Sequence, residues 1–103
     1  YESCFILLLN RANKTIGYVK ISQGGVSGTV VDVKLIAKYV VESLASGVIL
    51  AHNHPSGNLI PSHEDIALTR KVKEALKLLD SQLLDHVILS ADGYKSLADE
   101  GLL

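Results

Sequence analysis

The chain reads VILAHNHPSGNLIPSHED over residues 48–65. The first four letters form an apolar run with the length of a short buried strand, and His52 and His54 follow directly. Alternation along such a strand would direct both imidazoles to the same side. Pro61 and Ser62 stand where a helix would begin. The stretch therefore predicts a strand, a turn-rich loop and a helix, which is a building unit of α/β folds.

The sequence on both sides extends this unit. Apolar patterns predict strands at residues 4–9, 15–22, 84–90 and 94–97, with a flexible loop at 23–28. A helix is expected from residue 32 to about residue 46, ended by Gly47. The helix after Ser62 is expected to bury Ile66, Ala67, Val72, Ala75, Leu76 and Leu79. This order predicts an α/β fold with helices packed on a mixed sheet.

Composition narrows the class of protein. The 103 residues suit one domain, and 48% apolar with 20% charged residues is ordinary for a globular protein. A net charge of −1 gives no general attraction to nucleic acid, and the longest apolar run is too short to span a bilayer. The single cysteine, Cys4, excludes an internal disulfide and fits a reducing, cytoplasmic compartment. The chain begins at Tyr1 and contains no methionine, so we expect a piece of a longer protein.

The two histidines and a later carboxylate can supply three ligands to one metal ion. Asp65 follows His54 by eleven residues. Three protein ligands leave the fourth tetrahedral position of zinc open for water, which is the catalytic arrangement and not the structural one. The alternative is a pair of ordinary loop histidines. Ser62 and Asp65 also have a second interpretation, as the N-cap and N3 residues of a capping box, and the two interpretations are compatible.

The remaining titratable residues are assigned more modest roles. We expect His63 to face solvent and Cys4 to be inert packing. His86 follows Asp85 in an apolar pattern, and we expect either a hydrogen-bonded core pair or a pair that supports the metal ligands from behind.

A hydrolase also needs a general base, and the candidates are Glu2, Glu42, Glu64, Glu74 and Glu100. Glu2 would lie near the site if the first strand neighbours residues 48–51.

These residues resemble a known family. His52-x-His54, seven residues and Ser62-x-x-Asp65 match the JAMM motif of MPN+ metalloproteases. The string HNHPSG at residues 52–57, Pro61-Ser62, Leu84-Asp-His86 and the ending at residues 101–103 resemble the RadC family specifically. The resemblance covers essentially the whole chain, residues 1–103, as one RadC-like metal-hydrolase domain whose longer relatives carry an N-terminal region that is absent here.

The resemblance implies a fold and a site. The fold would be of the JAB1/MPN type, a mixed β-sheet flanked by helices with a layout similar to the cytidine deaminases. Zinc would be held by His52, His54 and Asp65, with water as the fourth ligand. Ser62 would stabilise the oxyanion. Glu2, in a segment similar to the family's Glu-x-x-Phe-x-x-Leu-x-Asn pattern, would be the general acid and base.

The activity implied is hydrolysis of peptide or isopeptide bonds by a metal-activated water, with a peptide or protein as substrate. The RadC family also carries a DNA-repair label. The alternative is therefore a nucleic-acid-associated repair or recombination module whose metal site is structural or vestigial. The balanced charge of this domain does not support DNA contact by itself. A deaminase is disfavoured because its Pro-Cys-x-x-Cys ligands are missing and Cys4 stands alone.

Overall fold

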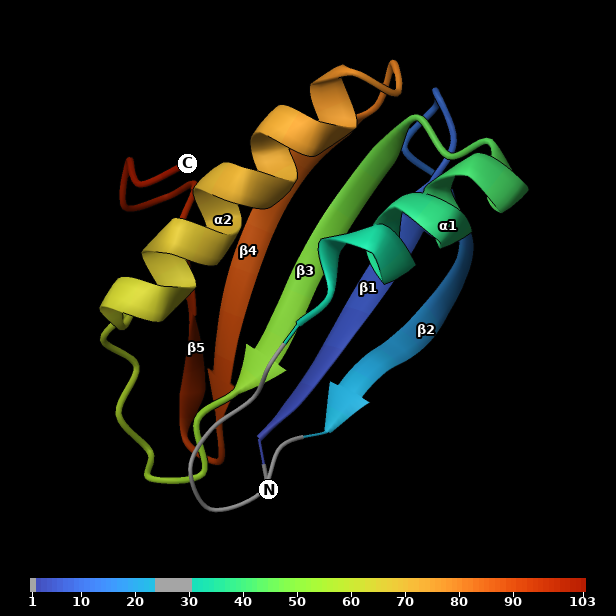
Figure 1. Ribbon diagram of the computed structural model, residues 1–103. Coiled ribbons are helices and arrows are strands. Elements are labelled where there is room, and N and C mark those ends of the chain that lie inside the picture. The colour runs from blue at the N-terminus through green and yellow to red at the C-terminus, as the bar shows by residue number, and fades with distance from the viewer. Residues whose placement is uncertain (1, 24–30) are drawn as a thin grey trace.

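The computed structural model describes residues 2–23 and 31–103 (Figure 1). Residues 24–28 of the predicted loop lie outside the described residues. In chain order the elements are β1 (Ser3–Leu9), β2 (Thr15–Gln23), α1 (Val33–Ser43), β3 (Gly47–Asn53), α2 (His63–Lys77), β4 (Gln82–Ser90) and β5 (Gly93–Ser96). Within the described ranges, none of the helices is long and apolar enough to cross a membrane.

The five strands form one mixed sheet with the order β2-β1-β3-β4-β5. β1 lies antiparallel to both β2 and β3, whereas β3 and β4 are parallel, and β5 is antiparallel to β4. A parallel pair needs a crossover connection, and α2 supplies it between β3 and β4. The predicted α/β class and mixed sheet are confirmed.

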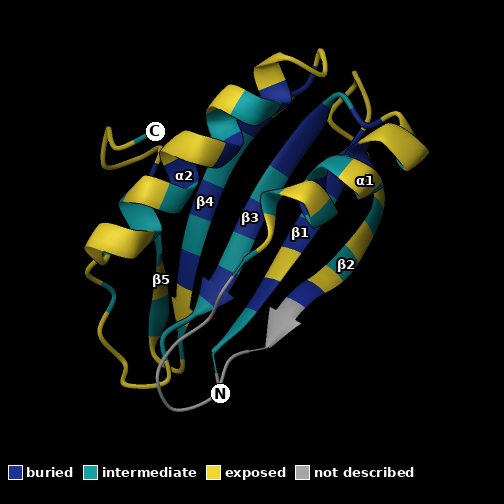
Figure 2. Ribbon diagram, in the orientation of Figure 1, coloured by how far each residue is buried: buried dark blue, intermediate teal, exposed yellow. Residues whose placement is uncertain are grey.

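Both helices lie over the same face of the sheet, α1 across β1 and β2 and α2 across β4 (Figure 1). Figure 2 shows the alternation of buried and more exposed residues along the central strands. The core lies between helices and sheet and includes Ile6, Ile36, Leu50, Val72 and Leu76. The opposite face of the sheet has no helix from the described part of the chain and exposes Phe5, Tyr18 and Leu89.

The first helix ends earlier than the sequence predicted. Its C-cap is Leu44, with a left-handed φ of 55°, and not Gly47. The chain turns there because Ala45 is buried and its N–H donates to the carbonyl of Val40. Gly47 instead opens β3, where a Cβ would come within 2.8 Å of Leu84 Cδ1. The glycine therefore lies in a closely packed strand, where a larger residue would require the Leu84 side chain to move, and it does not cap the helix.

The buried face of α2 also differs from the prediction. Ala67 and Leu79 are exposed, so their assignment to the buried stripe was wrong. The buried residues of the helix are Thr69, Val72 and Leu76. Residue 65 precedes Thr69 by one helical turn, so it lies on the same face as these three residues. The face that packs on the core is therefore the face that carries the candidate ligand Asp65.

Candidate metal centre

The three predicted ligands come from the end of one element and the start of the next. In β3, Val48, Leu50 and His52 alternate onto the helix-covered face of the sheet. His54 lies just beyond the strand, where its backbone N–H donates to the carbonyl of Leu89. Asp65 is in the first turn of α2. The loop after β3 leads to the start of α2 (Figure 1), and the Asp65 carboxylate there lies beside the imidazoles of His52 and His54.

The donor atoms of these residues converge. His52 Nε2 lies 3.1 Å from Asp65 Oδ1, and His54 Nε2 lies 3.1 Å from Asp65 Oδ2. The two Nε2 atoms are 2.9 Å apart. Ligands bound at zinc distances in a tetrahedron lie roughly 3.3–3.6 Å apart. The three donors therefore need to separate by only a few tenths of an ångström to hold such an ion, and two imidazoles with a carboxylate are a donor set that zinc accepts.

The capping box predicted for α2 is present together with this convergence. The Asp65 backbone N–H donates to Ser62 Oγ at 3.0 Å, and the Ser62 N–H donates to Asp65 Oδ2 at 2.8 Å. Burial raises the pKa of Asp65, but the adjacent imidazole of His52 and the hydrogen bonds with Ser62 outweigh it, so the net pKa lies below the usual range. Asp65 is therefore an anion at neutral pH, as a metal ligand must be.

His54 is supported by the loop that follows it. Its Nδ1 lies 2.6 Å from the carbonyl oxygen of Asn58, and the N–H of Gly57 donates to the carbonyl of His54. Gly57 has a φ of +84°, a conformation that side chains disfavour. The accepting carbonyl leaves the proton of His54 on Nδ1, so Nε2 is the nitrogen directed at the other two ligands.

His52 is supported by side chains from two other elements. Its Nδ1 lies 2.7 Å from Nε2 of His86 in β4, and His86 Nδ1 lies 2.5 Å from the hydroxyl oxygen of Thr69 in α2. Burial lowers the pKa of His86 to about 4, with further lowering by His52. His86 is consequently neutral at physiological pH.

The predicted pairing of His86 with Asp85 takes a different form in the structure. Asp85 Oδ1 accepts from the backbone N–H groups of His86 and Ala98, and Oδ2 accepts from the hydroxyl of Ser96. The carboxylate ties β4 to the segment after β5 and does not contact the imidazole. Thr69, which does contact it, was missed by the sequence analysis. Its signal was a hydroxyl four residues after Asp65, able to bond the carbonyl one turn earlier.

The two predicted catalytic residues are placed differently. Ser62 is at the centre, through its two hydrogen bonds with Asp65. Glu2 precedes β1, which lies beside β3 with Cys4 opposite His52. Continuing this antiparallel register by two residues would set Glu2 opposite His54. Within the described residues the Glu2 carboxylate makes no hydrogen bond or ion pair with the cluster, so the structure brings four of the five residues together and places the fifth at its edge.

Two further expectations are confirmed. Cys4 is buried, and burial, with a smaller contribution from Asp65, raises the pKa of its thiol to about 12. A neutral, enclosed thiol is poorly reactive. His63 is exposed at the first position of α2.

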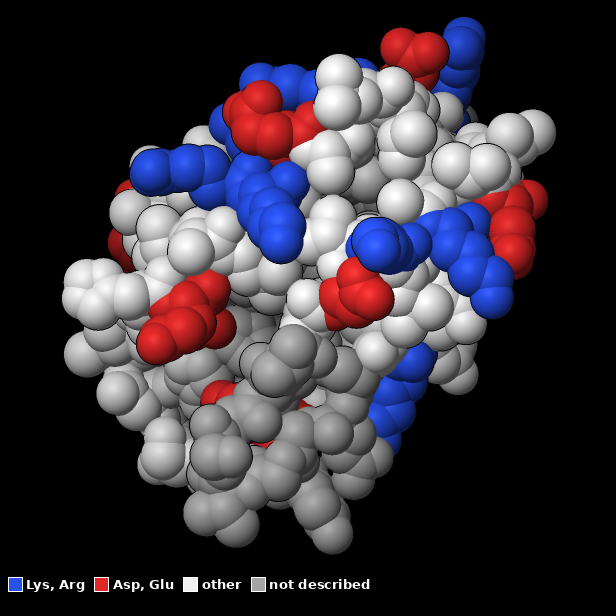
Figure 3. Space-filling model, viewed as in Figure 1, with Lys and Arg blue, Asp and Glu red and all other residues white. Residues whose placement is uncertain are grey.

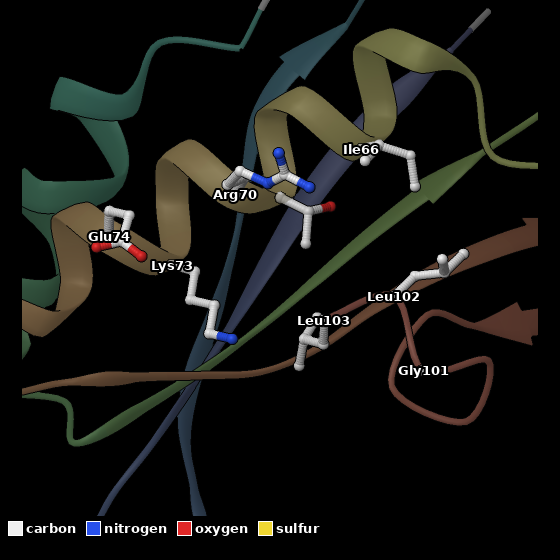
Figure 4. A pocket seen from close by; sticks show the side chains of 8 residues that line it. Ile66, Arg70, Lys73, Glu74, Gly101, Leu102 and Leu103 are labelled. Atoms are coloured by element: carbon white, nitrogen blue, oxygen red, sulfur yellow. The ribbon is translucent and has the colours of Figure 1, made fainter.

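A separate hollow of about 350 Å³ lies between α2 and the last residues of the described chain (Figure 4). Arg70, Lys73 and Glu74 bring charges of both signs to its lining, and Leu102 and Leu103 bring apolar groups. Thr69 lines it as well, and its hydroxyl donates to the carbonyl oxygen of Asp65. The hollow thus adjoins the candidate centre without containing its ligands.

Comparison with known proteins gives one consistent family. The profile of the RadC-like JAB domain matches residues 1–102. The chain is similar to UPF0758 proteins of Porphyromonas gingivalis (52% identity over 103 residues), Coprothermobacter proteolyticus (47% over 102) and Flavobacterium johnsoniae (46% over 102). These alignments cover 99% of this chain but 45%, 43% and 44% of the respective relatives. The chain therefore spans less than half the length of the curated relatives it matches.

Proposed function

The chain belongs to the RadC-like JAB domain family, and from this premise we propose that it is a zinc-dependent hydrolase of peptide or isopeptide bonds. The observation that supports the proposal is the convergence of His52 Nε2, His54 Nε2 and the Asp65 carboxylate within 3.1 Å of one another. Two neutral imidazoles and one anion would hold a divalent ion with a net positive charge. Three protein ligands leave the fourth coordination position of the ion open for water or substrate.

A bound ion would act as a Lewis acid. When bound, zinc lowers the pKa of a coordinated water toward neutrality and polarises a carbonyl oxygen. His52, His54 and Asp65 would hold it in place, and their side chains, which are only 8–14% exposed, would limit competing water. The substrate of this chemistry would be an amide carbonyl in an extended peptide or in a lysine-linked isopeptide.

Glu2 is the residue proposed to move the proton. A general base must take a proton from the attacking water and return it to the leaving amine. Glu2 directly precedes β1, at the end of the sheet where β3 terminates. Ser3 is held there because its N–H donates to Asn53 Oδ1 at 2.6 Å. This bond holds the start of β1 against the strand that carries His52. It brings the Glu2 backbone to the side of the ligands.

Ser62 is proposed to stabilise the negative charge that develops on the carbonyl oxygen. In the capping box its oxygen is an acceptor, from the Asp65 N–H. A hydroxyl that accepts in this way still has its own proton to donate. A donor aimed at a developing oxyanion contributes to catalysis in proportion to how well it is fixed beforehand, and the helix cap fixes Ser62.

The nucleic-acid alternative gains no specific support. On the face drawn in Figure 3, lysine and arginine side chains alternate with aspartate and glutamate over both helices. A DNA-binding surface would collect one sign of charge. The net charge of the chain is −1.

The proposal is tested with Glu2→Gln, which keeps the size of the side chain and removes its basicity. The chain loaded with zinc is assayed on peptides and on lysine-linked isopeptides, with zinc content measured in parallel. We expect Glu2→Gln to retain zinc and to lose turnover by about 100-fold or more. Glu42→Gln, the same change on the exposed surface of α1, is the matched control and keeps full activity. Full activity in Glu2→Gln would disprove the role of Glu2, and a wild-type chain that holds zinc but cleaves neither substrate class would disprove the activity.

A further inference from the structure

A buried chain of hydrogen bonds runs behind His52 and returns to another of the ligands. His52 Nδ1 lies 2.7 Å from His86 Nε2, and His86 Nδ1 lies 2.5 Å from Thr69 Oγ1. Thr69 Oγ1 donates to the carbonyl oxygen of Asp65 at 2.7 Å. The chain therefore crosses from β3 through β4 to α2. It connects a ligand on a strand to a ligand on a helix.

The chemistry of the four groups sets the direction of every bond. The Asp65 carbonyl can only accept, and the Thr69 hydroxyl has one proton, so Thr69 donates to Asp65 and accepts from His86 Nδ1–H. A neutral imidazole with its proton on Nδ1 has a lone pair on Nε2. His86 Nε2 therefore accepts from the Nδ1–H of His52.

The same reasoning fixes the protonation of the ligand. With its proton on Nδ1, His52 presents the lone pair of Nε2, the atom that lies 3.1 Å from Asp65 and 2.9 Å from His54 Nε2. The opposite direction of donation would protonate His52 Nε2 and block it as a ligand. Ring orientation and tautomer are both properties that the second nitrogen of a metal-binding histidine controls.

We propose that His86 and Thr69 are positioning residues, which hold His52 in the Nδ1–H tautomer and direct its Nε2 at the metal position. The proposal rests on the proposed function for the presence of the ion. The tautomer itself is a property of the metal-free chain and can be measured there.

Packing alone does not account for an imidazole at position 86. The ring is fully buried against the core face of the sheet, where its strand neighbour two residues along is the equally buried Ile88. A buried imidazole costs free energy unless both nitrogens are hydrogen-bonded, and an aliphatic side chain would fill the space without that requirement. Both nitrogens of His86 are bonded, one to β3 and one to α2.

The last acceptor in this chain of hydrogen bonds indicates that the chain orients His52. Asp85 is adjacent in sequence, yet its carboxylate accepts from Ser96 and from backbone N–H groups. The His86 ring is hydrogen-bonded to Thr69 instead. The last acceptor is a neutral carbonyl on the backbone of Asp65. A neutral terminus fixes a tautomer without placing a negative charge behind the ring.

The test compares Thr69→Val, which keeps the shape and removes the hydroxyl, with Thr69→Ser, which restores it. Long-range ¹⁵N–¹H spectra of the zinc-free chains report which ring nitrogen of each histidine is protonated, and exposed His63 is the internal reference. We expect His52 to carry its proton on Nδ1 in wild type and Thr69→Ser and to populate the Nε2–H form in Thr69→Val. Zinc titration should show a loss of affinity of about 10- to 100-fold in Thr69→Val alone.

Controls separate this outcome from general damage. Thr15→Val removes a hydroxyl from an exposed position of β2 and should leave both the spectra and the zinc affinity unchanged. If Thr69→Val does not fold, His86→Gln and His86→Leu replace it, because glutamine offers an acceptor to His52 and a donor to Thr69, whereas leucine offers neither. We expect the leucine variant to lose more zinc affinity than the glutamine variant.

The results that overturn the proposal are distinct from those that overturn the proposed function. Wild-type His52 protonated on Nε2, or a Thr69→Val chain with the wild-type tautomer and zinc affinity, would contradict the positioning role. Equal affinities in His86→Gln and His86→Leu would do so as well. If the wild-type chain shows the predicted tautomers but binds no zinc, the orientation of His52 is supported. The metal-dependent function is refuted by the same result.

Discussion

The two histidines of the candidate centre are held by two regions of different kinds. His52 lies in β3, and its second nitrogen contacts the buried ring of His86 from β4. His54 lies after the strand, and its second nitrogen contacts the backbone carbonyl of Asn58, four residues along the same loop. The strand side of the centre, which is His52 and its contacts, therefore depends on side chains from other elements. The loop side, which is His54 and its contacts, depends on the local backbone. Substitutions far away in sequence should affect the first, whereas loop conformation should affect the second.

The two histidines meet at Asp65. Removal of its charge should weaken zinc binding by both histidines together. Asp65→Asn keeps an oxygen that can accept from the Ser62 N–H, so the cap of α2 is retained. The loss of the only anionic ligand should weaken zinc binding by about 100-fold or more, as followed by calorimetric titration. Asp32→Asn makes the same change at the N-cap of α1 and should bind zinc like wild type. Wild-type affinity in Asp65→Asn would remove this residue from the centre.

The strand side should make the stability of the zinc-free chain sensitive to mild acid. Burial lowers the pKa of His86 from 6.5 to about 4, so between these values the unfolded chain binds a proton that the folded chain does not. The contribution of this group to stability is therefore fully present above pH 6.5 and is lost as the pH drops to 4, by roughly 3 kcal/mol. Asp65, whose pKa is depressed, loses its contribution only at still lower pH.

Urea denaturation at several pH values measures this dependence, with His86→Gln as the comparison. The variant should lose most of the slope between pH 6.5 and 4, because glutamine does not titrate there. A slope equal to that of wild type would assign the acid sensitivity to another group.

The loop side should respond to backbone strain. Gly57 has a φ of +84°, and no atom lies within 4 Å of the position that a Cβ would occupy. Gly57→Ala should therefore cost about 1 kcal/mol through conformation alone and shift the carbonyl that holds His54, with a several-fold loss of zinc affinity. Gly17→Ala in β2, equally open but without a positive φ, is the control and should be nearly neutral. An alanine variant at position 57 with unchanged stability and affinity would contradict this account of the loop.

Sequence reasoning predicted the loop side of the centre better than the strand side. The spacing of His52, His54, Ser62 and Asp65 is local information, and the capping box and the turn residues of the loop follow from neighbouring positions. The contact between His86 and Thr69 joins β4 to α2 and depends on how the helix crosses the sheet, which no local pattern encodes. For this reason the sequence suggested the adjacent Asp85 as the partner of His86.

The fold shows the same division between features set by local sequence and features set by tertiary packing. The positions of strands and helices along the chain and the α/β class follow from apolar patterns, whereas the order of the strands in the sheet does not. The β1–β3 pairing that would place Glu2 near the site was foreseen as a condition only. The end of α1 at Leu44 and the exposure of Ala67 were not foreseen. Both depend on tertiary packing, namely the burial of Ala45 and the rotation of α2 that turns Thr69 inward.

The most direct test of the central claim is metal content by elemental analysis of the wild-type chain and of His54→Ala. Both are purified near neutral pH without chelator, because the histidines must be neutral to bind. The account predicts about one zinc per chain in wild type and none in the variant. A wild-type chain that holds no metal even after zinc is added back, or a His54→Ala chain that holds as much as wild type, would contradict it.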